Sequence, residues 1–248
     1  MGSAAGFSAL RNALTSQLPN YVIRETSTLT ASSLSGASFV WLGVASGQTT
    51  AVTPLSALEQ QALTDFLFSG GSIVLFGDNS TFSPSSPATQ ATFFSPFGIS
   101  ITGTLNGTQT HQIVDPSNYV TNGTFGVVGN YNTGFPGWFT TLPTGTNIFA
   151  RFVSNNQPSA VIIPAGTLGA GTGNVVAFSD SGAYSTGGAN SGDFERMYLN
   201  ILSRVGRLQG DIELQDYVGS TAGKVVTLEL LNGSTVVHST TVTLDASG

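Results

Sequence analysis

The sequence predicts an α/β domain with a mainly parallel sheet and helices on both faces, followed by a small C-terminal all-β module. Two similar segments indicate the sheet: residues 71–77 and 173–178 are continuous apolar runs that begin at glycine and are closely followed by an aspartate and small polar residues. Runs without alternation are typical of strands buried on both faces, as in a parallel sheet covered by helices. Helical patterns lie between the predicted strands, which favours an α/β layered architecture.

Each remaining element follows from its local pattern. Apolar residues at helical spacing predict helices, and short apolar runs predict strands. Thr53 is placed to cap the central helix, and Pro54 suits its first turn. Residues 80–147, interrupted by Gly, Pro, Thr and Asn, predict loops with short strands and one brief helix. The predicted elements are, in order, helix 7–18, strands 21–23 and 38–44, helix 54–68, strands 71–77, 148–153, 159–163 and 173–178, and helix 193–205.

The pattern changes after Arg207, where helical spacing ends. Asn232-Gly233 is a strong signal for a type I′ hairpin turn. We therefore divide the chain into an α/β domain, residues 1–206, and a partial β module, residues 207–248. The predicted strands of this module are rich in Val and Thr and span residues 211–217, 224–231 and 234–244.

Composition excludes several classes of function. The formal net charge is −6 and Lys224 is the only lysine, so the basic surface that nucleic-acid binding needs is missing. The absence of cysteine excludes disulfides, thiolate nucleophiles and cysteine-based metal sites. No apolar stretch reaches membrane-spanning length. Low charge with abundant Thr, Ser, Asn and Gly is typical of bacterial secreted and surface proteins, so we expect an extracellular or cell-surface location, although this chain shows no signal peptide.

The polar residues of the candidate site follow the two similar strands. Asp78 and Asn79 come after the first strand, and Asp180 and Ser181 come after the second. Ligands of open α/β sheets bind beyond the carboxyl ends of the strands. We therefore expect these four residues to converge at one edge of the sheet and to contact a ligand there.

Each candidate has a structural and a functional interpretation. Asp78 and Asp180 can cap turns through backbone hydrogen bonds, or act as an acid–base pair or as ligands of a hard cation such as Ca²⁺ or Mg²⁺. His111, expected near the strand ends, can bond a backbone carbonyl or take part in chemistry. Arg151, also expected nearby, can clamp a carboxylate or lie at the surface. Trp138 belongs to a set of aromatic residues that predicts a packing layer, with a carbohydrate platform as the alternative.

Three segments, Leu55–Asp78, Thr110–Ile113 and Gly173–Leu202, resemble the class I glutamine-amidotransferase-like (flavodoxin-like) domains. The resemblance is to the divergent branch found in bacterial surface proteins and in an intraflagellar-transport subunit. It implies a flavodoxin-like fold, with Asp78 near the family's nucleophilic cysteine and Asp180-Ser181 near its histidine. Since the chain has neither that cysteine nor the His-x-Glu pair, the resemblance implies a pseudoenzyme that cannot hydrolyse glutamine by the family mechanism.

Two further resemblances are weaker. Phe76–Asn79 and Phe178–Ser181 are similar to the Gly-Asp-Ser start of GDSL-type esterases. However, the first segment has Asn79 in place of the serine, and no Asp-x-x-His follows the second. The C-terminal segment resembles the start of β-sandwich modules appended to bacterial secreted proteins, through residues 214–219, 225–229 and 242–248.

These patterns predict a non-catalytic extracellular or cell-surface bacterial domain with a binding or structural assembly role and no cofactor. The alternative is a hydrolase that uses Asp78, Asp180 and His111 at the strand ends, either metal-assisted or GDSL-esterase-like. The branch usually opens with a strand that is missing before the first helix, and the β module has too few strands to close a sandwich. Open sheet edges recruit strands, so we expect self-association by strand addition, with a surface polymer or a protein as a further partner.

Overall fold

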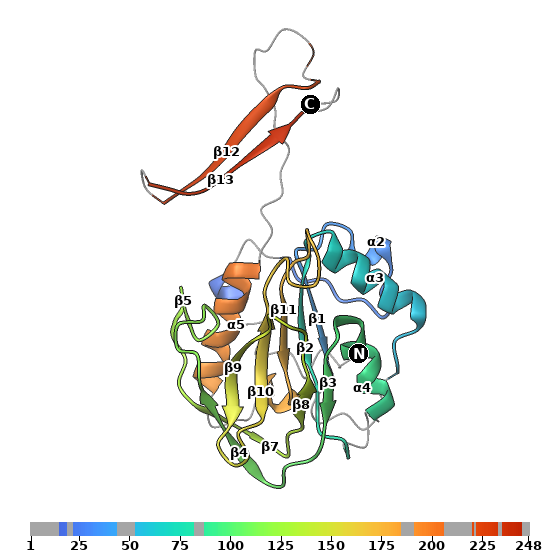
Figure 1. Ribbon diagram of the computed structural model, residues 1–248, viewed down its shortest axis with the longest axis vertical. Coiled ribbons are helices and arrows are strands. Elements are labelled where there is room, and N and C mark those ends of the chain that lie inside the picture. The colour runs from blue at the N-terminus through green and yellow to red at the C-terminus, as the bar shows by residue number, and fades with distance from the viewer. Residues whose placement is uncertain are drawn as a thin grey trace. The chain divides into compact units, whose positions relative to one another are not determined.

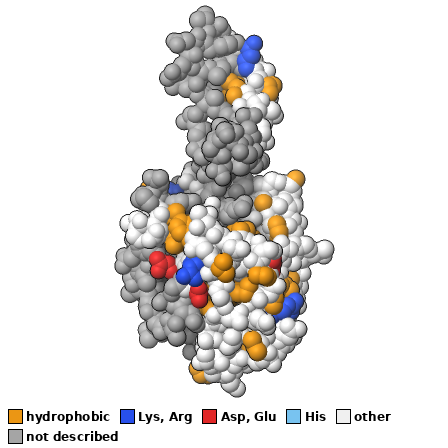
Figure 2. Space-filling model, turned by 90° about the vertical axis from the view of Figure 1, so that its left-hand side faces the viewer, with side chains coloured by type: hydrophobic (Ala, Val, Ile, Leu, Met, Phe, Trp, Pro, Cys, Tyr) orange, Lys and Arg blue, Asp and Glu red, His pale blue; other side chains and the backbone are white. Residues whose placement is uncertain are grey.

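The computed structural model describes residues 15–18, 22–43, 53–81, 87–184, 191–205, 220, 222–232 and 235–244. The chain divides into two compact units, Met1–Arg207 and Leu208–Gly248. Within the described ranges, no helix combines the length and the apolar character that a membrane crossing requires. Charged side chains are few on the face shown in Figure 2, as the composition leads one to expect.

A curled, seven-stranded mixed sheet forms the centre of the first unit (Figure 1). Its strands are β1 (Phe39–Gly43), β2 (Ser72–Phe76), β4 (Thr108–Ile113), β7 (Tyr131–Gly134), β9 (Asn147–Phe152), β10 (Pro158–Ile163) and β11 (Val175–Phe178). They lie in the order β1-β2-β11-β10-β9-β4-β7. β1, β2 and β11 are parallel to one another, whereas every pairing from β11 through β10, β9 and β4 to β7 is antiparallel.

The predicted fold class is therefore wrong, because the sheet is not mainly parallel and the architecture is not flavodoxin-like. The predicted strands 38–44, 71–77 and 173–178 do lie side by side in parallel, as β1, β2 and β11. The error concerns the strands between them in the sequence. β9 and β10 are joined by residues 153–157 only, and a parallel connection needs about a dozen residues or more. This short link imposes antiparallel pairing of β9 with β10, and the observed sheet is a mostly β half-barrel.

Two apolar cores lie on the two faces of this sheet. On one face, helix α5 (Ser191–Val205) packs Met197 and Ile201 into the core that contains Phe178. On the other face, helices α3 (Ala57–Phe68) and α4 (Pro87–Phe94) contribute Leu63 and Phe94 to the core that contains Leu75. Both Leu75 and Val176 are fully buried, as their unbroken apolar runs predict.

Helix α3 begins later than predicted, because Ser56 rather than Thr53 caps it. The Ser56 hydroxyl accepts a hydrogen bond from the backbone N–H of Glu59, and the Glu59 carboxylate accepts one from the backbone N–H of Ser56. This reciprocal capping box satisfies two N–H groups that the helix start leaves without intrahelical partners.

Several smaller elements complete the first unit. Val22 and Ile23 lie in irregular backbone rather than in the predicted strand, and the predicted helix 7–18 lies mostly outside the described residues. The smaller elements are α2 (Ala31–Leu34), the 3-10 helices η1 (Ser95–Phe97) and η2 (Ser181–Tyr184), and the strand pairs β3 (Ser100–Thr102) with β8 (Trp138–Thr141) and β5 (Asn122–Gly123) with β6 (Gly126–Val127).

The described part of the second unit is one antiparallel hairpin. Strand β12 (Val225–Asn232) pairs with β13 (Thr235–Thr243). The predicted strand 211–217 and the glycine of the predicted turn lie outside the described residues. Within those that are described, this unit has no further strand, so the assignment to a β-sandwich module has no structural support.

Candidate functional site

The candidate site lies where β2 and β11 end side by side. Asp78 and Asn79 follow β2, Asp180 and Ser181 follow β11, and all four are buried. The Ser181 hydroxyl donates a hydrogen bond to one carboxylate oxygen of Asp78. The other oxygen accepts from the backbone N–H of Asn79 at 2.8 Å and from its side-chain amide at 3.0 Å. The structure thus brings these residues together, because neighbouring parallel strands end about 5 Å apart.

Burial shifts both carboxyl groups toward their protonated forms. It raises the pKa of Asp78 to about 6, although hydrogen bonds from Ser181 and Asn79 oppose the shift. Burial also raises the pKa of Asp180 well above its usual value, and the negative charge of Asp78 raises it further. A hydrogen bond donated by the Gly182 amide opposes this second shift. The two carboxyl groups therefore titrate as a coupled pair.

His111 belongs to the same buried cluster but is not bonded to Ser181. It lies on β4, and its Nε2 shares a hydrogen bond of 2.8 Å with the Thr133 hydroxyl on β7. Its other ring nitrogen, Nδ1, has no partner among the described residues. Burial lowers the pKa of His111 to about 3, so the imidazole is neutral at physiological pH. The Thr133 hydroxyl also lowers the pKa of Asp180, so the bonded His111–Thr133 pair lies beside the carboxyl pair.

Other buried polar atoms of this cluster have unused hydrogen-bonding capacity. Within the described residues, Asp180 Oδ2 and the hydroxyls of Tyr131 and Ser159 have no partner at hydrogen-bonding geometry. Burial raises the pKa of Tyr131, the charge of Asp180 raises it further, and the nearby Ser159 hydroxyl opposes the shift without forming a well-aligned bond. Sequence reasoning missed Tyr131, Thr133 and Ser159, because no local pattern marks a polar residue that a distant strand brings into a cluster.

Two predicted site residues lie apart from the carboxyl pair. Arg151 is on β9 and donates a hydrogen bond of 2.8 Å to the carbonyl of Asn156, in the turn that leads to β10. It therefore stabilises a hairpin turn and is not bonded to either aspartate. Trp138 on β8 is half-buried, and a Cβ placed on Gly103 would lie 1.9 Å from its indole. One face of that ring is consequently covered by backbone.

The loop after β7 packs directly on the strand end. The Asn79 side-chain amide donates a hydrogen bond of 2.7 Å to the carbonyl of Phe135. Gly137 makes the close approach possible, because a Cβ there would lie 2.9 Å from the Asp78 carbonyl oxygen. Asn79 thus joins the carboxyl pair to a surface loop, which is a role that its position in the sequence did not indicate.

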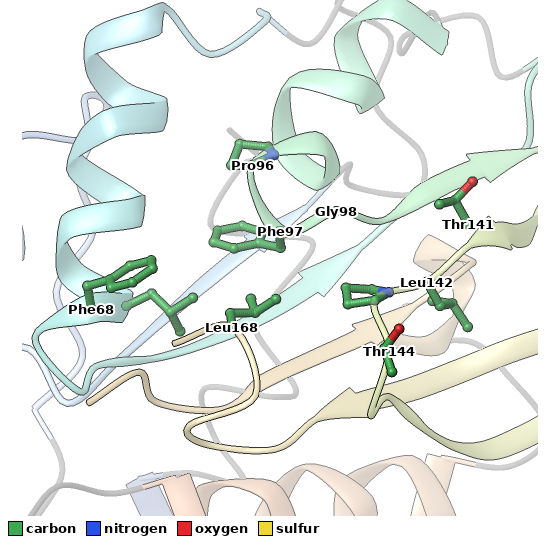
Figure 3. A pocket seen from close by; sticks show the side chains of 10 residues that line it. Phe68, Pro96, Phe97, Gly98, Thr141, Leu142, Thr144 and Leu168 are labelled. Atoms are coloured by element: carbon green, nitrogen blue, oxygen red, sulfur yellow. The ribbon is translucent and has the colours of Figure 1, made fainter. Parts of the chain in front are cut away.

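A shallow pocket lies away from the candidate site (Figure 3). It has a volume of about 440 Å³ and lies near the start of β2, whereas Asp78 follows its end. Its walls are mainly apolar, with two threonines, and none of the strand-end residues lines it. The lining includes Phe68, Pro96, Phe97, Thr141, Thr144 and Leu168.

The arrangement at the strand ends does not form a serine–histidine relay. Nucleophilic catalysis requires the base within hydrogen-bond reach of the nucleophile. Ser181 is bonded to the Asp78 carboxylate, whereas His111 is bonded to Thr133. Nor do three or more Asp, Glu or His side chains gather as metal ligands anywhere in the described ranges. The chemical property that the geometry supports is the coupled protonation of two carboxyl groups.

No protein-family model and no curated protein matches the sequence, but solved structures resemble the fold at low identity. The mmIFT52 N-terminal domain has a TM-score of 0.60 at 14% identity, over 84% of this chain and 93% of that chain. A cytoplasmic protein from Salmonella typhimurium LT2 has a TM-score of 0.54 at 12% identity, over 82% and 88%. A protein described as ThuA-like, from Bacteroides uniformis ATCC 8492, has a TM-score of 0.51 at 10% identity, over 81% and 84%.

These similarities show the fold alone, and they fit a mostly β, curled mixed sheet. The assignment to the glutamine-amidotransferase-like (flavodoxin-like) domains is therefore wrong, since it required a parallel sheet. The segments that suggested it are apolar strands next to amphipathic helices, and such pairs occur in many folds. The interpretation as a pseudoenzyme of that family falls with the assignment, and the comparisons support neither a bacterial extracellular origin nor an oligomer.

Proposed function

We propose that this chain is a non-catalytic domain with a binding and assembly role. The observation that carries the proposal is the hydrogen-bond pattern at the strand ends, where Ser181 bonds Asp78 while His111 bonds Thr133. With His111 bonded to Thr133, Ser181 lacks the imidazole base that activates the hydroxyl in a serine–histidine pair. These residues are also buried, and the pocket lies elsewhere. The contacts of the strand-end residues are those of a cluster that holds two strand ends together. The proposed cell-surface location is supported by the composition alone.

The assembly role is supported by the hairpin of the second unit. Within the described residues, β12 and β13 pair only with each other. An isolated two-stranded hairpin is marginally stable at best in water, and its unpaired edges accept further strands. Residues 240–244 contain no charge and no proline, which favours such pairing. A second copy of this chain is the proposed partner, because every copy presents the same edge.

Light scattering tests the assembly role on the full chain and on residues 1–206. We expect oligomers of the full chain that grow with concentration, and a monomer for residues 1–206. Circular dichroism of both chains checks that the truncation leaves the first unit folded. A monodisperse monomer for both chains at high concentration would refute self-association.

A hydrolase that uses Asp78, Asp180 and His111 is the second candidate. The observation in its favour is the pair of buried carboxyl groups with raised pKa values, which in other enzymes serve as acid and base. The test is turnover of p-nitrophenyl acetate and p-nitrophenyl glycosides between pH 5 and 8, with and without Ca²⁺ or Mg²⁺. We expect no turnover and no thermal stabilisation by either cation. Turnover that Asp78→Asn abolishes would establish the hydrolase instead.

A further inference from the structure

Phe135 combines an exposed aromatic ring with a backbone conformation that bulky residues avoid. Its φ angle is +57°, in the left-handed region, and its side chain is 55% exposed. A phenylalanine with positive φ is a genuine outlier, and such strain persists only where surrounding contacts impose it. Because the ring is largely exposed, its own packing does not offset the strain. Burial of the ring therefore does not explain why a phenylalanine occupies this strained position.

Hydrogen bonds on both sides of Phe135 impose this conformation. The Phe135 carbonyl accepts from the Asn79 amide at 2.7 Å, and the Phe135 N–H donates to the Gly107 carbonyl at 2.9 Å. The next carbonyl, of Pro136, accepts from the N–H of Leu105 at 2.9 Å. An aromatic ring on such a clamped loop loses little conformational freedom when it binds a ligand.

Three neutral hydroxyl groups lie next to Asn79, the side chain that holds the Phe135 carbonyl. The Asn79 side-chain oxygen accepts from the Thr81 hydroxyl at 2.8 Å and lies 3.5 Å from the Thr104 hydroxyl. The Ser80 hydroxyl lies 3.3 Å from that of Thr104. Thr81 is exposed, and Ser80 and Thr104 are partly exposed. Asp78, the charged residue next to this group, is buried, so these hydroxyls offer uncharged donors and acceptors near the Phe135 backbone that Asn79 holds.

We propose that Phe135, with the hydroxyls of Ser80, Thr81 and Thr104, binds a neutral carbohydrate. A sugar ring has a face of C–H groups that packs on an aromatic ring, while its hydroxyls need hydrogen-bond partners at the rim. The exposed ring and the neutral hydroxyls supply both features. An anionic ligand would find no opposite charge among these residues. This inference rests on the proposed binding role and specifies its ligand.

Affinity electrophoresis in gels that contain soluble starch, laminarin, galactomannan or the anionic polymer alginate tests the proposal on the full chain. We expect at least one neutral polysaccharide to retard the wild-type protein and alginate to leave it unaffected. Phe135→Ala should weaken retardation by about tenfold or more, because the stacking contact is lost. Phe68→Ala is the matched control, since Phe68 is 50% exposed but lines the separate pocket; it should leave retardation unchanged.

Two further variants separate a binding role from a structural one. Phe135→Tyr keeps the ring and should retain binding, whereas Thr104→Val removes one hydroxyl at constant shape and should weaken it. The proposal is overturned if no neutral polysaccharide retards the wild type, if Phe135→Ala binds as well as wild type, or if Phe68→Ala loses binding equally. Light scattering of the same samples reports self-association separately, so failure of the assembly role and failure of carbohydrate binding are distinguishable.

Discussion

Asn200 on α5 and Asp180 after β11 are both buried polar side chains, but their hydrogen-bonding capacity is used differently. The Asn200 carbonyl oxygen accepts from the Phe125 N–H at 2.8 Å. Its amide donates to the carbonyls of Val120 at 3.2 Å and Gly126 at 2.9 Å. Asp180 accepts from the Gly182 amide through one oxygen, while its Oδ2 has no partner among the described residues.

This difference separates a structural anchor from a proton-dependent centre. A neutral amide whose two N–H donors and carbonyl oxygen all have partners rigidifies its surroundings at any pH, and Asn200 so fastens the β5–β6 segment to α5. A buried carboxyl group that is only partly satisfied has an energy that depends on its proton. The strand-end cluster also imposes backbone strain on Phe135 through Asn79, which the Asn200 anchor does not do for its segment.

The largest loss of folding stability is expected when the Asn200 amide is removed. Asn200→Leu keeps the volume but leaves one N–H and two carbonyls without their partner. Each such buried group costs about 1–3 kcal/mol, so we expect the free energy of unfolding in urea to fall by about 3 kcal/mol or more. The exposed Ser203 on the same helix is the control, and Ser203→Ala should change stability by less than about 0.5 kcal/mol. Equal effects of the two variants would contradict the role of Asn200.

The second prediction concerns the pH dependence of stability. Because its pKa is raised in the folded state, Asp78 contributes stability that is lost as pH rises from about 4 to 6. The lowered pKa of His111 has the opposite effect between about pH 3 and 6.5, so the two partly cancel. The raised pKa of Asp180 acts in the same direction as that of Asp78, so it adds to the loss of stability as pH rises above the usual range of an aspartate.

Asp180→Asn tests this decline, because an amide can still accept the Gly182 bond but carries no titrating proton. We expect urea unfolding of the variant to show a smaller loss of stability with rising pH than the wild type shows. Asp65→Asn, an exposed change on α3, is the control and should leave the wild-type slope intact. If wild type and variant showed the same dependence of stability on pH, Asp180 would not hold a proton in the folded state.

A smaller change in stability, this time a gain, is expected when the strain at Phe135 is removed. Phe135→Gly removes a residue that is costly at positive φ, and relief of about 1–3 kcal/mol of strain exceeds the entropy cost of glycine. We expect a net gain of about 1 kcal/mol in thermal unfolding. Phe68→Gly removes an equally exposed ring from the end of a helix and should destabilise the protein instead. A loss of stability in Phe135→Gly would show that the ring packs well enough to offset the strain.

The smallest effect should come from the ion pair on α5. Arg196 bonds Asp193 at 2.6 Å and the Val127 carbonyl at 2.8 Å, but both charged side chains are partly exposed. Such pairs contribute about 0.5 kcal/mol or less. Arg196→Ala should therefore lower the free energy of unfolding by that amount, and by less in high salt. A loss close to that of Asn200→Leu would make the ion pair, and not the amide, the main anchor of this segment.

The sequence predicted the strands more successfully than their arrangement. Continuous apolar runs identified β2 and β11, because a strand buried on both faces leaves no position for a polar residue. Apolar runs do not indicate whether neighbouring strands are parallel or antiparallel. The prediction of a mainly parallel sheet was therefore wrong at β9 and β10. The short link of residues 153–157 was the available signal for a hairpin.

The candidate site was predicted in part for the same reason. Asp78, Asn79, Asp180 and Ser181 follow two similar strands, so their meeting required only that those strands be neighbours. Tyr131, Thr133 and Phe135 come from a region without periodicity, and no local pattern distinguishes the exposed Phe135 from the buried Phe139.

The sequence by itself determined which segments are buried, which strand ends carry polar groups, and which chemistry the absence of cysteine excludes. Only the tertiary structure decided that the sheet is mixed, that His111 bonds Thr133 rather than Ser181, and that Asn79 holds Phe135 in a strained, exposed conformation. The physical reason is that local periodicity predicts burial, whereas hydrogen-bond partners and the sign of φ depend on contacts between residues far apart in the chain.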